Sequence, residues 1–470
     1  MTSKASKLAI PTPAPVRDLL ALIGRTPLVE LTRFDTGLCR LFVKLESQNP
    51  GGSIKDRIAL SMVEQAERSG HIRPGATLIE ATAGNTGIGL ALVAVRKGYR
   101  LILVIPDKMA QEKIFHLKAL GAEVRITRSD VGKGHPEYYQ DIAERLASEI
   151  PGAFYVNQFA NPANAQAHEQ TTGPEIWEQM GHDLDAVVCG VGSGGTITGL
   201  SRFFYRVAPQ VRMILADPAG SILAGYIETG VLSEAGSWAV EGIGEDFIPP
   251  LADLSHVSQA MAVSDLESFA TARELLSREG ILAGSSSGTL VAAALRYCRH
   301  QTTAQRVVTF ICDSGNKYLS KVFNDFWMLD QGLIERPVSH DLRDLITRRY
   351  SEGATVTLAP QDTLLTAYHR MRRADVSQLP VVDAERVVGI LDESDLLLAI
   401  YTDHHCFGDP VAQAMTANLE TLPVDAPLSA LLPVFDRGQV AIVLEGTQFL
   451  GLITRIDLIN YLRRTMQERP

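Results

Sequence analysis

Long apolar stretches are absent from the 470-residue sequence, so we expect no membrane-spanning helix and no membrane partner. Paired cysteine spacing is absent as well, because none of the five cysteines forms a CxxC pair or a zinc-ligand pattern. We therefore expect reduced thiols, no metal site and a cytoplasmic location. Residues 1–15 are polar and proline-rich and lack the apolar core of a signal peptide, which predicts a flexible tail.

Basic residues are fewer than acidic ones, which gives a net charge of -10 and a pI of about 5.6. Such a chain offers no basic surface, so nucleic acid is not an expected partner. The content is 46% hydrophobic and 21% charged, which indicates a globular protein with a large core. The length predicts two to three domains.

Short apolar strands alternate with helical patterns through the first two thirds of the chain. This alternation predicts a mostly parallel, twisted α/β sheet, whose ligands bind at loops leaving the carboxyl ends of strands. The predicted strands span residues 41–46, 78–80, 101–105, 124–126, 186–191, 212–216 and 307–311. Helices are predicted at residues 19–23 and 112–120.

Lys55 lies where a turn meets a helix. The turn is formed by residues 49–52, Asn-Pro-Gly-Gly, and Ser53 is the predicted N-cap. Apolar residues then recur at helical spacing, at Ile58, Met62, Val63 and Ala66. The bare N–H groups of a first helical turn, together with burial, favour the neutral amine that forms a Schiff base. The alternative is a solvent-facing lysine in a glycine-rich turn.

Two glycine-containing loops follow predicted strands. Residues 82–87, Thr-Ala-Gly-Asn-Thr-Gly, open a small-residue helix whose N–H groups can hold a carboxylate, while Asn85 can bond a ring hydroxyl. Residues 190–199 contain five glycines between a strand and a helix, which indicates a phosphate cradle of backbone N–H groups. An ordinary strand–helix turn is the alternative for the first loop, and a merely flexible loop for the second.

The second loop also fits another class of protein. Gly190, Gly192 and Gly195 match G-x-G-x-x-G, and Asp217 ends the next strand where a ribose-binding acid is expected. An NAD-dependent dehydrogenase is therefore an alternative. It leaves Lys55 and Asn85 unexplained, whereas a single phosphate on a cofactor held by a lysine explains both.

A third segment, residues 284–289, places three serines before an alanine-rich helix. Serines at a helix start are usually caps, and on this segment alone that interpretation is the simpler one. Beside the other loops, one of the hydroxyls can meet a ring nitrogen.

These motifs resemble those of the fold-type II pyridoxal-phosphate enzymes, and more narrowly of the cysteine synthase and cystathionine β-synthase group. The resemblance covers residues 19–329 and implies a catalytic domain of two parallel-sheet α/β subdomains at residues 16–335, with pyridoxal 5′-phosphate as cofactor. Lys55 would be both the Schiff-base lysine and the catalytic base. The other cofactor-binding residues would be Asn85 at the ring 3-hydroxyl, Gly192, Ser193, Gly194, Gly195 and Thr196 at the phosphate, and Ser286 at the pyridine nitrogen.

The same resemblance implies a substrate site and no haem, because no Cys/His haem segment precedes the catalytic region. The chain departs from the family pattern at Ala83, where serine is usual, and at Phe159 and Glu245, where tyrosines are common. The residues implied around the substrate carboxylate are Thr82, Ala83, Asn85, Thr86 and Gln158, with Gly242 and Gly244 lining the pocket.

A tandem repeat fills the C-terminal third of the sequence. Residues 389–397 recur as residues 451–459, 62 residues later, and each copy has the pattern helix, two strands, helix. The copies resemble two CBS domains, at residues 338–400 and 408–468, that together form an α+β Bateman module.

Bateman modules commonly bind adenosine-containing ligands, so the resemblance implies S-adenosylmethionine or a nucleotide as a partner. Asp457 would hold the ribose and Thr454 a phosphate or its equivalent. In the first copy Asp395 is present, but Asp392 stands where threonine or serine is usual. The alternative is a pair of structural or dimerising repeats without a ligand.

The module favours cystathionine β-synthase, because plain cysteine synthases lack it. We therefore expect β-replacement that condenses the amino acids L-serine and L-homocysteine to cystathionine, with hydrogen sulfide released when cysteine replaces serine. A homodimer or homotetramer is expected. The alternatives are a cysteine synthase acting on O-acetylserine and sulfide, and a nucleotide-sensing protein with a degenerate pyridoxal-phosphate domain.

Overall fold

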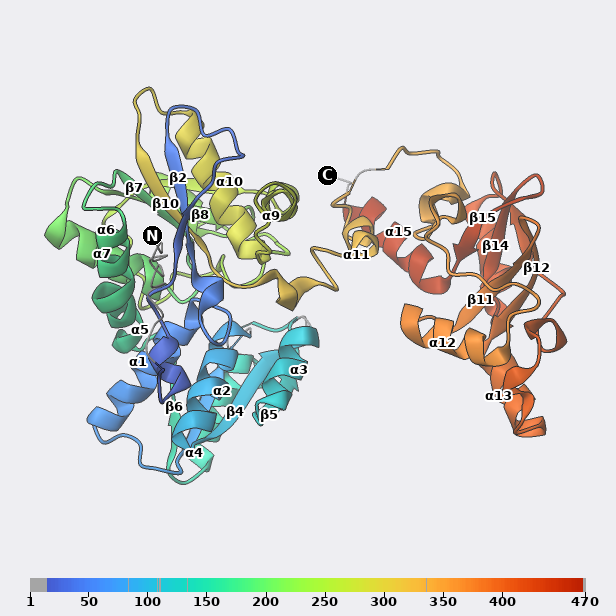
Figure 1. Cartoon of the computed structure of the whole chain (residues 1–470), viewed down its shortest axis with the longest axis horizontal. Coiled ribbons are helices and arrows are strands. Elements are labelled where there is room, and N and C mark those ends of the chain that lie inside the picture. The colour runs from blue at the N-terminus through green and yellow to red at the C-terminus, as the bar shows by residue number, and fades with distance from the viewer. Residues whose placement is uncertain are drawn as a thin grey trace, which may run out of the picture. The chain divides into compact units, whose positions relative to one another are not determined.

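The computed structural model describes residues 15–467 except 83, 108, 110, 133 and 335, and the chain divides into two compact units, Met1–Asn324 and Asp325–Pro470 (Figure 1). Nearly all of the tail predicted at residues 1–15 lies outside the described residues. In the described part of the chain, no helix is long and apolar enough to span a bilayer. The same part holds no cluster of His, Cys, Asp and Glu suited to a metal ion.

The first unit contains a six-stranded sheet in which β1 is antiparallel to β2 and the other neighbours are parallel. Helix α10 (Ser285–Arg299) packs on this sheet and on α9 (Asp265–Glu279). In spatial order the strands are β1 (Leu28–Glu30), β2 (Arg40–Leu45), β10 (Arg306–Ile311), β7 (Ala186–Cys189), β8 (Arg212–Pro218) and β9 (Val257–Val263). The remaining helices of this part are α5 (Pro162–Ala167), α6 (Gly173–Gln179), α7 (Gly195–Val207) and α8 (Leu223–Thr229).

A second sheet of four strands, all parallel, lies in the same unit (Figure 1). Its strands, in spatial order, are β5 (Glu123–Thr127), β4 (Arg100–Pro106), β3 (Thr77–Ala81) and β6 (Ala153–Tyr155). Its helices are α1 (Lys55–Arg68), α2 (Asn85–Lys97), α3 (Gln111–Ala119) and α4 (Tyr139–Glu149). Ile79 of β3 packs towards α4 and Leu78 towards α1 and α2, as expected of a strand covered on both faces.

Helix α1 connects the two sheets, because β2 belongs to the first sheet whereas α1 packs on α2 beside the second. The four apolar residues predicted to form its inner face are buried, which confirms the helical spacing. The N-cap prediction was wrong by one residue. Ile54 holds the cap position without a side-chain hydrogen bond, and the Ser53 hydroxyl accepts the Lys55 N–H at 3.3 Å.

Every strand predicted from the sequence overlaps a strand of the structure, and the parallel α/β class is confirmed. In the first unit, strands β1, β6 and β9 were not predicted. Two of them have only three residues, and the exposed positions of β9 interrupt its apolar pattern.

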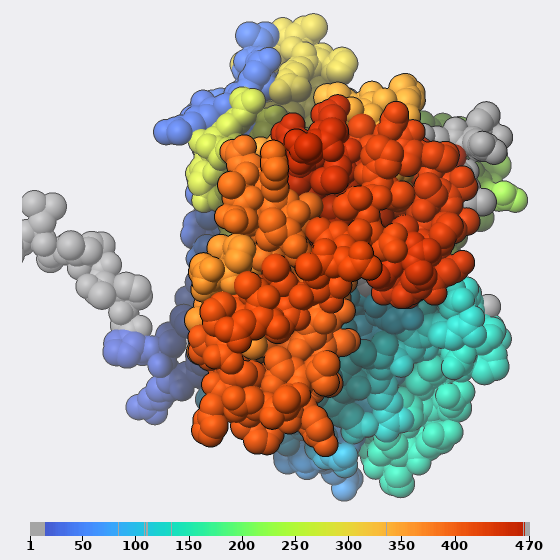
Figure 2. All heavy atoms as spheres, turned by 90° about the vertical axis from the view of Figure 1, so that its right-hand side faces the viewer, coloured from blue at the N-terminus to red at the C-terminus, as the bar shows by residue number. Residues whose placement is uncertain are grey.

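The second unit, which α11 (Asp325–Asp330) opens, consists mainly of two copies of one motif, and Figure 2 shows them side by side in orange and red. The first copy contains α12 (Leu364–Ala374), β11 (Gln378–Asp383), β12 (Arg386–Asp392) and α13 (Glu393–Thr402). The second contains β13 (Thr421–Pro423), α14 (Leu431–Asp436), β14 (Ala441–Glu445), β15 (Gln448–Ile453) and α15 (Arg455–Gln467).

The register of the two hairpins confirms the internal repeat. A bulge between Val381 and Val382 in the first copy has its counterpart between Val443 and Leu444, at the 62-residue offset of the sequence repeat.

A buried ion-pair network stabilises the start of α1. The Arg57 guanidinium binds Glu46 at 2.7 Å and Glu175 at 2.7 Å, and Lys44 binds Glu175 at 2.8 Å. The side chains of Lys44 and Glu46 are fully buried. Removal of one partner from such a network leaves an unpaired buried charge, which is strongly destabilising.

We predict that Arg57→Ala lowers the free energy of unfolding by about 3–5 kcal/mol, because Glu46 then lies buried without its cation. Arg128→Ala is the matched control, since Arg128 pairs with Asp130 at the surface, and it should leave the free energy of unfolding close to that of the wild type. Urea titration of both variants measures the difference. Equal losses in the two variants would contradict a stabilising role for the network.

Candidate active site

Lys55 is the first residue of α1, so it lies in the first helical turn as predicted. The segment before it pairs with the segment after β10. Ser53 forms a β-bridge with Asp313, and the Ile54 N–H donates to the Cys312 carbonyl at 2.8 Å. Burial lowers the pKa of Lys55, although the charges of Cys312 and Asp313 act in the opposite direction. The amine therefore gives up its proton more readily than a surface lysine.

The three predicted loops all leave the carboxyl ends of parallel strands or begin helices. Asn85 is the first residue of α2 after β3, Gly195 the first of α7 after β7, and Ser285 the first of α10. Two of these loops are joined to the turn before Lys55 through Cys312 and Asp313, which bind that turn as well as the first residues of α2 and α10. Ala83, predicted at the substrate site, lies outside the described residues.

The side-chain amide of Asn85 is held at both ends. Its Nδ2 donates to Asp313 Oδ2 at 2.7 Å, and its Oδ1 accepts from Lys317 Nζ at 2.9 Å. Asp313 also accepts the Tyr318 hydroxyl at 2.7 Å. A fixed amide at this position can direct a hydrogen bond, which its predicted role requires.

The glycine loop before α7 is packed so closely that side chains could not replace its glycines. A Cβ on Gly195 would lie 1.8 Å from Asn164 Oδ1, and one on Gly192 would lie 2.6 Å from the Gly242 carbonyl oxygen. Gly194 has a φ of +87°, which favours glycine. The first N–H groups of α7 have no acceptor within the helix, so this loop presents donors suited to a phosphate.

Side chains around this loop are also fixed. The Asn164 amide donates to Ser193 Oγ at 2.9 Å and to the Gln158 carbonyl at 2.8 Å. Thr196 Oγ1 lies 3.2 Å from Nε2 of the buried His168, which follows α5. Burial lowers the pKa of His168 well below its ordinary value, so the ring is neutral.

The serine cluster at the start of α10 is not a simple cap. Gly284 holds the cap position, and no side chain caps the helix. Ser285 Oγ accepts the Glu241 N–H at 3.1 Å, and Ser287 Oγ accepts the Cys312 N–H at 2.9 Å. The hydroxyl of Ser286 lies beside the Cys312 thiol, whose pKa burial raises to about 12. Of the three serines, Ser286 is therefore the one whose hydroxyl forms no hydrogen bond with the backbone in the described contacts.

Two of the residues expected at the substrate carboxylate bind each other directly. Thr86 Oγ1 donates to Gln158 Oε1 at 2.6 Å, and Gln158 Nε2 donates to the Ala81 carbonyl at 3.4 Å. Thr82 Oγ1 accepts the Gly84 N–H at 3.1 Å. Thr86 and Gln158 thus form one polar group near the carboxyl end of β3, and Thr82 directly follows that strand.

Glycines in residues 240–246 border the same region. Gly242 and Gly244 both have positive φ, of 89° and 86°, and the Gly244 N–H donates to the Val191 carbonyl at 2.8 Å. This segment therefore runs beside the glycine loop before α7, as its predicted position in the pocket requires.

Sequence reasoning missed Glu80, which lies fully buried in β3 beneath the polar group. Its Oε2 accepts the Gln158 N–H at 3.2 Å, and the N–H groups of Ala81 and Asn157 also donate to it. Burial raises the pKa of Glu80 to about 8. The Glu80 carboxyl thus fixes the backbone of Gln158. The carboxyl is mostly protonated at neutral pH.

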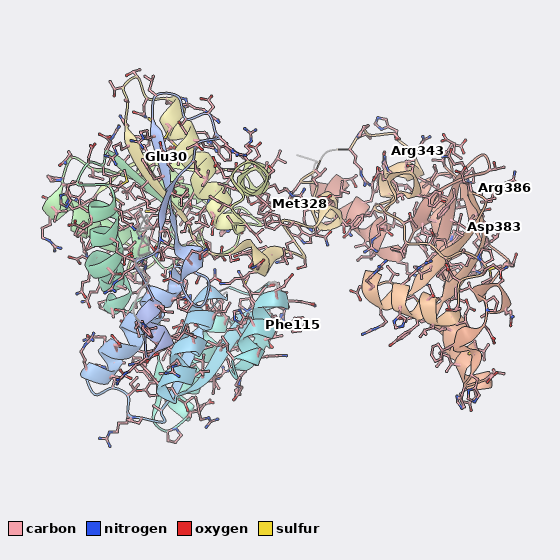
Figure 3. The ribbon with its side chains drawn as sticks, in the orientation of Figure 1. Glu30, Phe115, Met328, Arg343, Asp383 and Arg386 are labelled. Carbon is pink, nitrogen blue, oxygen red and sulfur yellow. The ribbon has the colours of Figure 1, made fainter. Side chains whose placement is uncertain are left out.

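A second missed feature is the buried pair of Lys113 on α3 and Glu241, at 2.7 Å. Lys113 also donates to the Tyr318 hydroxyl at 2.9 Å, and its Cδ would lie 2.6 Å from a Cβ on Gly84. The Lys113 side chain therefore lies across Gly84, in the loop that leads into α2. Phe115, labelled in Figure 3, lies on the opposite, exposed face of α3.

The predicted ligand residues of the repeat unit are engaged by neighbouring groups. Asp457 accepts hydrogen bonds from Thr347 Oγ1 at 3.0 Å and from the Thr454 N–H at 2.8 Å. In the first copy, Asp392 and Asp395 form a capping box at the start of α13, which explains an aspartate at position 392. Their ligand roles stay predictions.

Comparison with known proteins assigns both units. Residues 19–313 match the family of pyridoxal-phosphate dependent enzymes, and residues 342–402 and 411–464 each match the CBS domain. A cystathionine β-synthase of Dictyostelium discoideum is 38% identical over 467 residues, covering 96% of this chain and 93% of the relative. That of Saccharomyces cerevisiae is 35% identical and covers 95% of this chain and 97% of its own.

Relatives of the catalytic unit alone are also similar. Cysteine synthase 1 of Neurospora crassa is 41% identical but covers 68% of this chain. The crystal structure of an O-acetylserine dependent cystathionine β-synthase from Helicobacter pylori matches with a TM-score of 0.61 and 37% identity, covering 66% of this chain and 99% of its own. A hydrogen sulfide-producing enzyme from Fusobacterium nucleatum matches with a TM-score of 0.61 and 36% identity, covering 65% of this chain and all of its own.

The chain belongs to the fold-type II family of pyridoxal-phosphate dependent enzymes. Its relatives at nearly full length are the cystathionine β-synthases, which match the catalytic unit and the CBS repeats together. The dehydrogenase alternative is therefore wrong. Asp217, which it required at a ribose, is fully buried and accepts the Ala224 N–H at 2.8 Å at the start of α8.

We predict that Glu80→Gln changes how stability depends on pH. Because the folded pKa of about 8 exceeds the ordinary value of 4.5, the stabilisation by Glu80 is complete below pH 4.5 and is lost as the pH rises to 8. Over this range the free energy of unfolding should fall more steeply with pH in the wild type than in the variant. The two slopes should differ by up to about 1.4 kcal/mol per pH unit. Urea titrations at pH 5, 6.5 and 8 measure this slope, and Glu144→Gln, at an exposed residue of α4, should keep the wild-type slope.

Proposed function

We propose that this chain is a cystathionine β-synthase that condenses L-serine with L-homocysteine and releases hydrogen sulfide when cysteine replaces serine. The observation that carries the proposal is the position of Lys55. Lys55 has an amine whose pKa is lowered by burial, and it is the first residue of α1. It lies beside loops whose motifs resemble the cofactor and substrate loops of the family. The relatives named cystathionine β-synthase, which match over nearly the whole chain, support the same activity.

The residues present fit pyridoxal phosphate, because close-packed glycines at positions 192 and 195 leave a helix N-terminus open for a phosphate. Lys55 would hold the cofactor covalently, Asn85 would bond its 3-oxygen and Ser286 its ring nitrogen. The phosphate would lie on Gly192, Ser193, Gly194, Gly195 and Thr196. When bound, the cofactor withdraws electrons from the Cα–H bond of an amino acid and so allows the β-substituent to leave.

The protein's own groups then supply binding and proton transfer. Thr82, Thr86 and Gln158 would hold the substrate carboxylate, with Glu80 fixing the backbone of Gln158 from beneath. Once the substrate's amino group has replaced Lys55 on the cofactor, the freed and neutral Lys55 amine would take the Cα proton as general base and return it after the thiol has added. A neutral hydroxyl at Ser286 does not protonate the ring nitrogen, which suits a reaction whose leaving group departs promptly.

The loop with Gly242 and Gly244 would border the second substrate, and the buried Lys113–Glu241 pair would exclude water above it. This is also where the chain departs from its family. Phe159 and Glu245 stand where tyrosines are common, and Phe159 packs against Phe247 at 5.9 Å between ring centroids.

Cysteine synthase activity with O-acetylserine and sulfide is a second candidate. The cysteine synthase of Neurospora crassa, which matches the catalytic unit, favours it. The O-acetylserine dependent cystathionine β-synthase of Helicobacter pylori supports only O-acetylserine as a substrate. Parallel assays of the purified protein, with serine plus homocysteine and with O-acetylserine plus sulfide, distinguish the two. A higher kcat/KM with the second pair would overturn the proposed reaction.

We predict that Lys55→Ala lowers the rate of product formation by about 10²–10⁴-fold or more, because it removes both the tether and the base. The assay to use is whichever of the two shows activity in the wild type. Lys97→Ala is the matched control, as Lys97 binds Glu67 away from the loops and should keep wild-type turnover. Undiminished turnover in the Lys55 variant would refute the assignment.

The repeat unit would bind an adenosine ligand, S-adenosylmethionine or a nucleotide, chiefly through Asp457, with Thr454 beside it and Asp395 in the corresponding place of the first copy. We propose domain limits of 16–335 for the catalytic domain, and of 338–400 and 408–468 for the two CBS domains. We also propose that the protein is cytoplasmic, forms a homodimer or homotetramer, and binds no haem. Regulation would follow only if the ligand prefers one arrangement of the assembly.

We predict that S-adenosylmethionine, ATP or AMP raises the melting temperature by several degrees, since ligand at 100 times its Kd adds about 2.7 kcal/mol. Differential scanning fluorimetry measures the shift. Asp457→Ala should remove it, whereas Asp383→Ala on the β11–β12 hairpin, labelled in Figure 3, should keep it. No shift with any of the three compounds would identify the repeats as a structural or dimerising element.

A further inference from the structure

Lys317 is a buried lysine that no motif of the sequence pointed to. It lies in the short 3₁₀ helix Gly315–Tyr318, which follows β10. Its amine donates to the Gly51 carbonyl at 3.0 Å, to the Gly52 carbonyl at 3.1 Å and to Asn85 Oδ1 at 2.9 Å. An ammonium group has three N–H donors, and each one has an acceptor here. The geometry therefore fits the charged form of Lys317.

The contact with Lys317 fixes which way the Asn85 amide points. A lysine ammonium can only donate, so the atom facing it is the amide oxygen. The amide nitrogen therefore faces Asp313, to which it donates. One N–H of Asn85 Nδ2 is used by Asp313. The amide is left with its second N–H to offer, so towards a ligand Asn85 acts as a donor.

We propose that Lys317 is a positioning residue that holds Asn85 as a hydrogen-bond donor to the 3-oxygen of pyridoxal phosphate and so favours the ionised form of that oxygen. The inference rests on the proposed function, since it requires the cofactor ring beside Asn85. A hydrogen-bond donor stabilises an ionised oxygen more than it stabilises a hydroxyl group. The positive charge of Lys317, which binds the other end of the Asn85 amide, acts in the same direction.

The charges around Lys317 agree with this role. Burial lowers the pKa of Lys317 to about 8, while Asp313 and Asp56 raise it and Lys113 lowers it. His116 on α3 responds in turn, because burial and the Lys317 charge both lower its pKa. The ammonium is thus charged at neutral pH and has little solvent to screen it.

The same amine joins two parts of the site. Gly51 and Gly52 belong to the turn before Lys55, and Asn85 opens α2. Lys317 therefore sets the spacing between the lysine that would hold the cofactor and the amide that would bond its 3-oxygen.

The test is the absorption spectrum of the purified protein loaded with pyridoxal phosphate, which reports the ratio of ionised to protonated 3-oxygen in the bound cofactor. Lys317→Met keeps most of the chain length but removes the charge and the donors. We expect it to shift this ratio about tenfold towards the protonated form and to weaken cofactor affinity by a similar factor, as for loss of a hydrogen bond to a charged group. Lys321→Met is the control, because it removes an equal charge nearby that pairs with Glu241, and it should keep the wild-type ratio.

A double-mutant cycle with Asn85→Ala decides whether the two residues act as one unit. In the Asn85→Ala background, Lys317→Met should change the ratio much less than it does in the wild type, because only the direct effect of the Lys317 charge is then lost. An unchanged spectrum in Lys317→Met, or effects that simply add, would overturn the inference. If Lys317→Met does not fold by circular dichroism, Lys317→Gln repeats the test with a smaller change. A wild type that binds no pyridoxal phosphate would instead refute the proposed function.

Discussion

The catalytic unit depends on one buried contact, between the turn that precedes Lys55 and the segment that follows β10. The backbone of Ile54 and Cys312, the bridge from Ser53 to Asp313 and the amine of Lys317 all contribute to it. This contact places the start of α1, which packs with one sheet, against the end of a strand of the other. Because helix α2 is held to the same segment through Asn85, the lysine and the substrate loop keep a fixed distance.

The sequence was informative where the chemistry depends on backbone. Close approach requires glycine, so the loop before α7 and the turn before Lys55 could be recognised from residue type and order. Strand positions were equally accessible, because strands covered on both faces are continuously apolar. Glu80, Lys113 and Lys317 could not be found in this way. Each is one charged residue within an ordinary pattern, and its partners lie 78, 128 and 232 residues away along the chain.

In the repeat unit, the sequence predicted the fold but not the surroundings of the residue expected to bind a ligand. Its internal repeat and its order of helices and strands were evident from residues 389–397 and 451–459, and even the hairpin bulges recur. What the pattern could not show is that Asp457 binds Thr347, a residue far upstream of its own copy. A ligand that uses Asp457 must therefore compete with hydroxyl groups of the protein, which costs part of its binding free energy.

The long sequence separation between Asn85 and Asp313 has a consequence for biosynthesis. The two residues are 228 positions apart, so the amide that would bond the cofactor is not fixed until β10 and the residues after it have been synthesised and have docked. A nascent chain that ends before residue 313 has the glycine loop and Lys55 but lacks the group that orients Asn85. The complete set of groups around Asn85 therefore forms only after parts of the chain far apart in sequence have docked, which makes it a late feature of the folding of this unit.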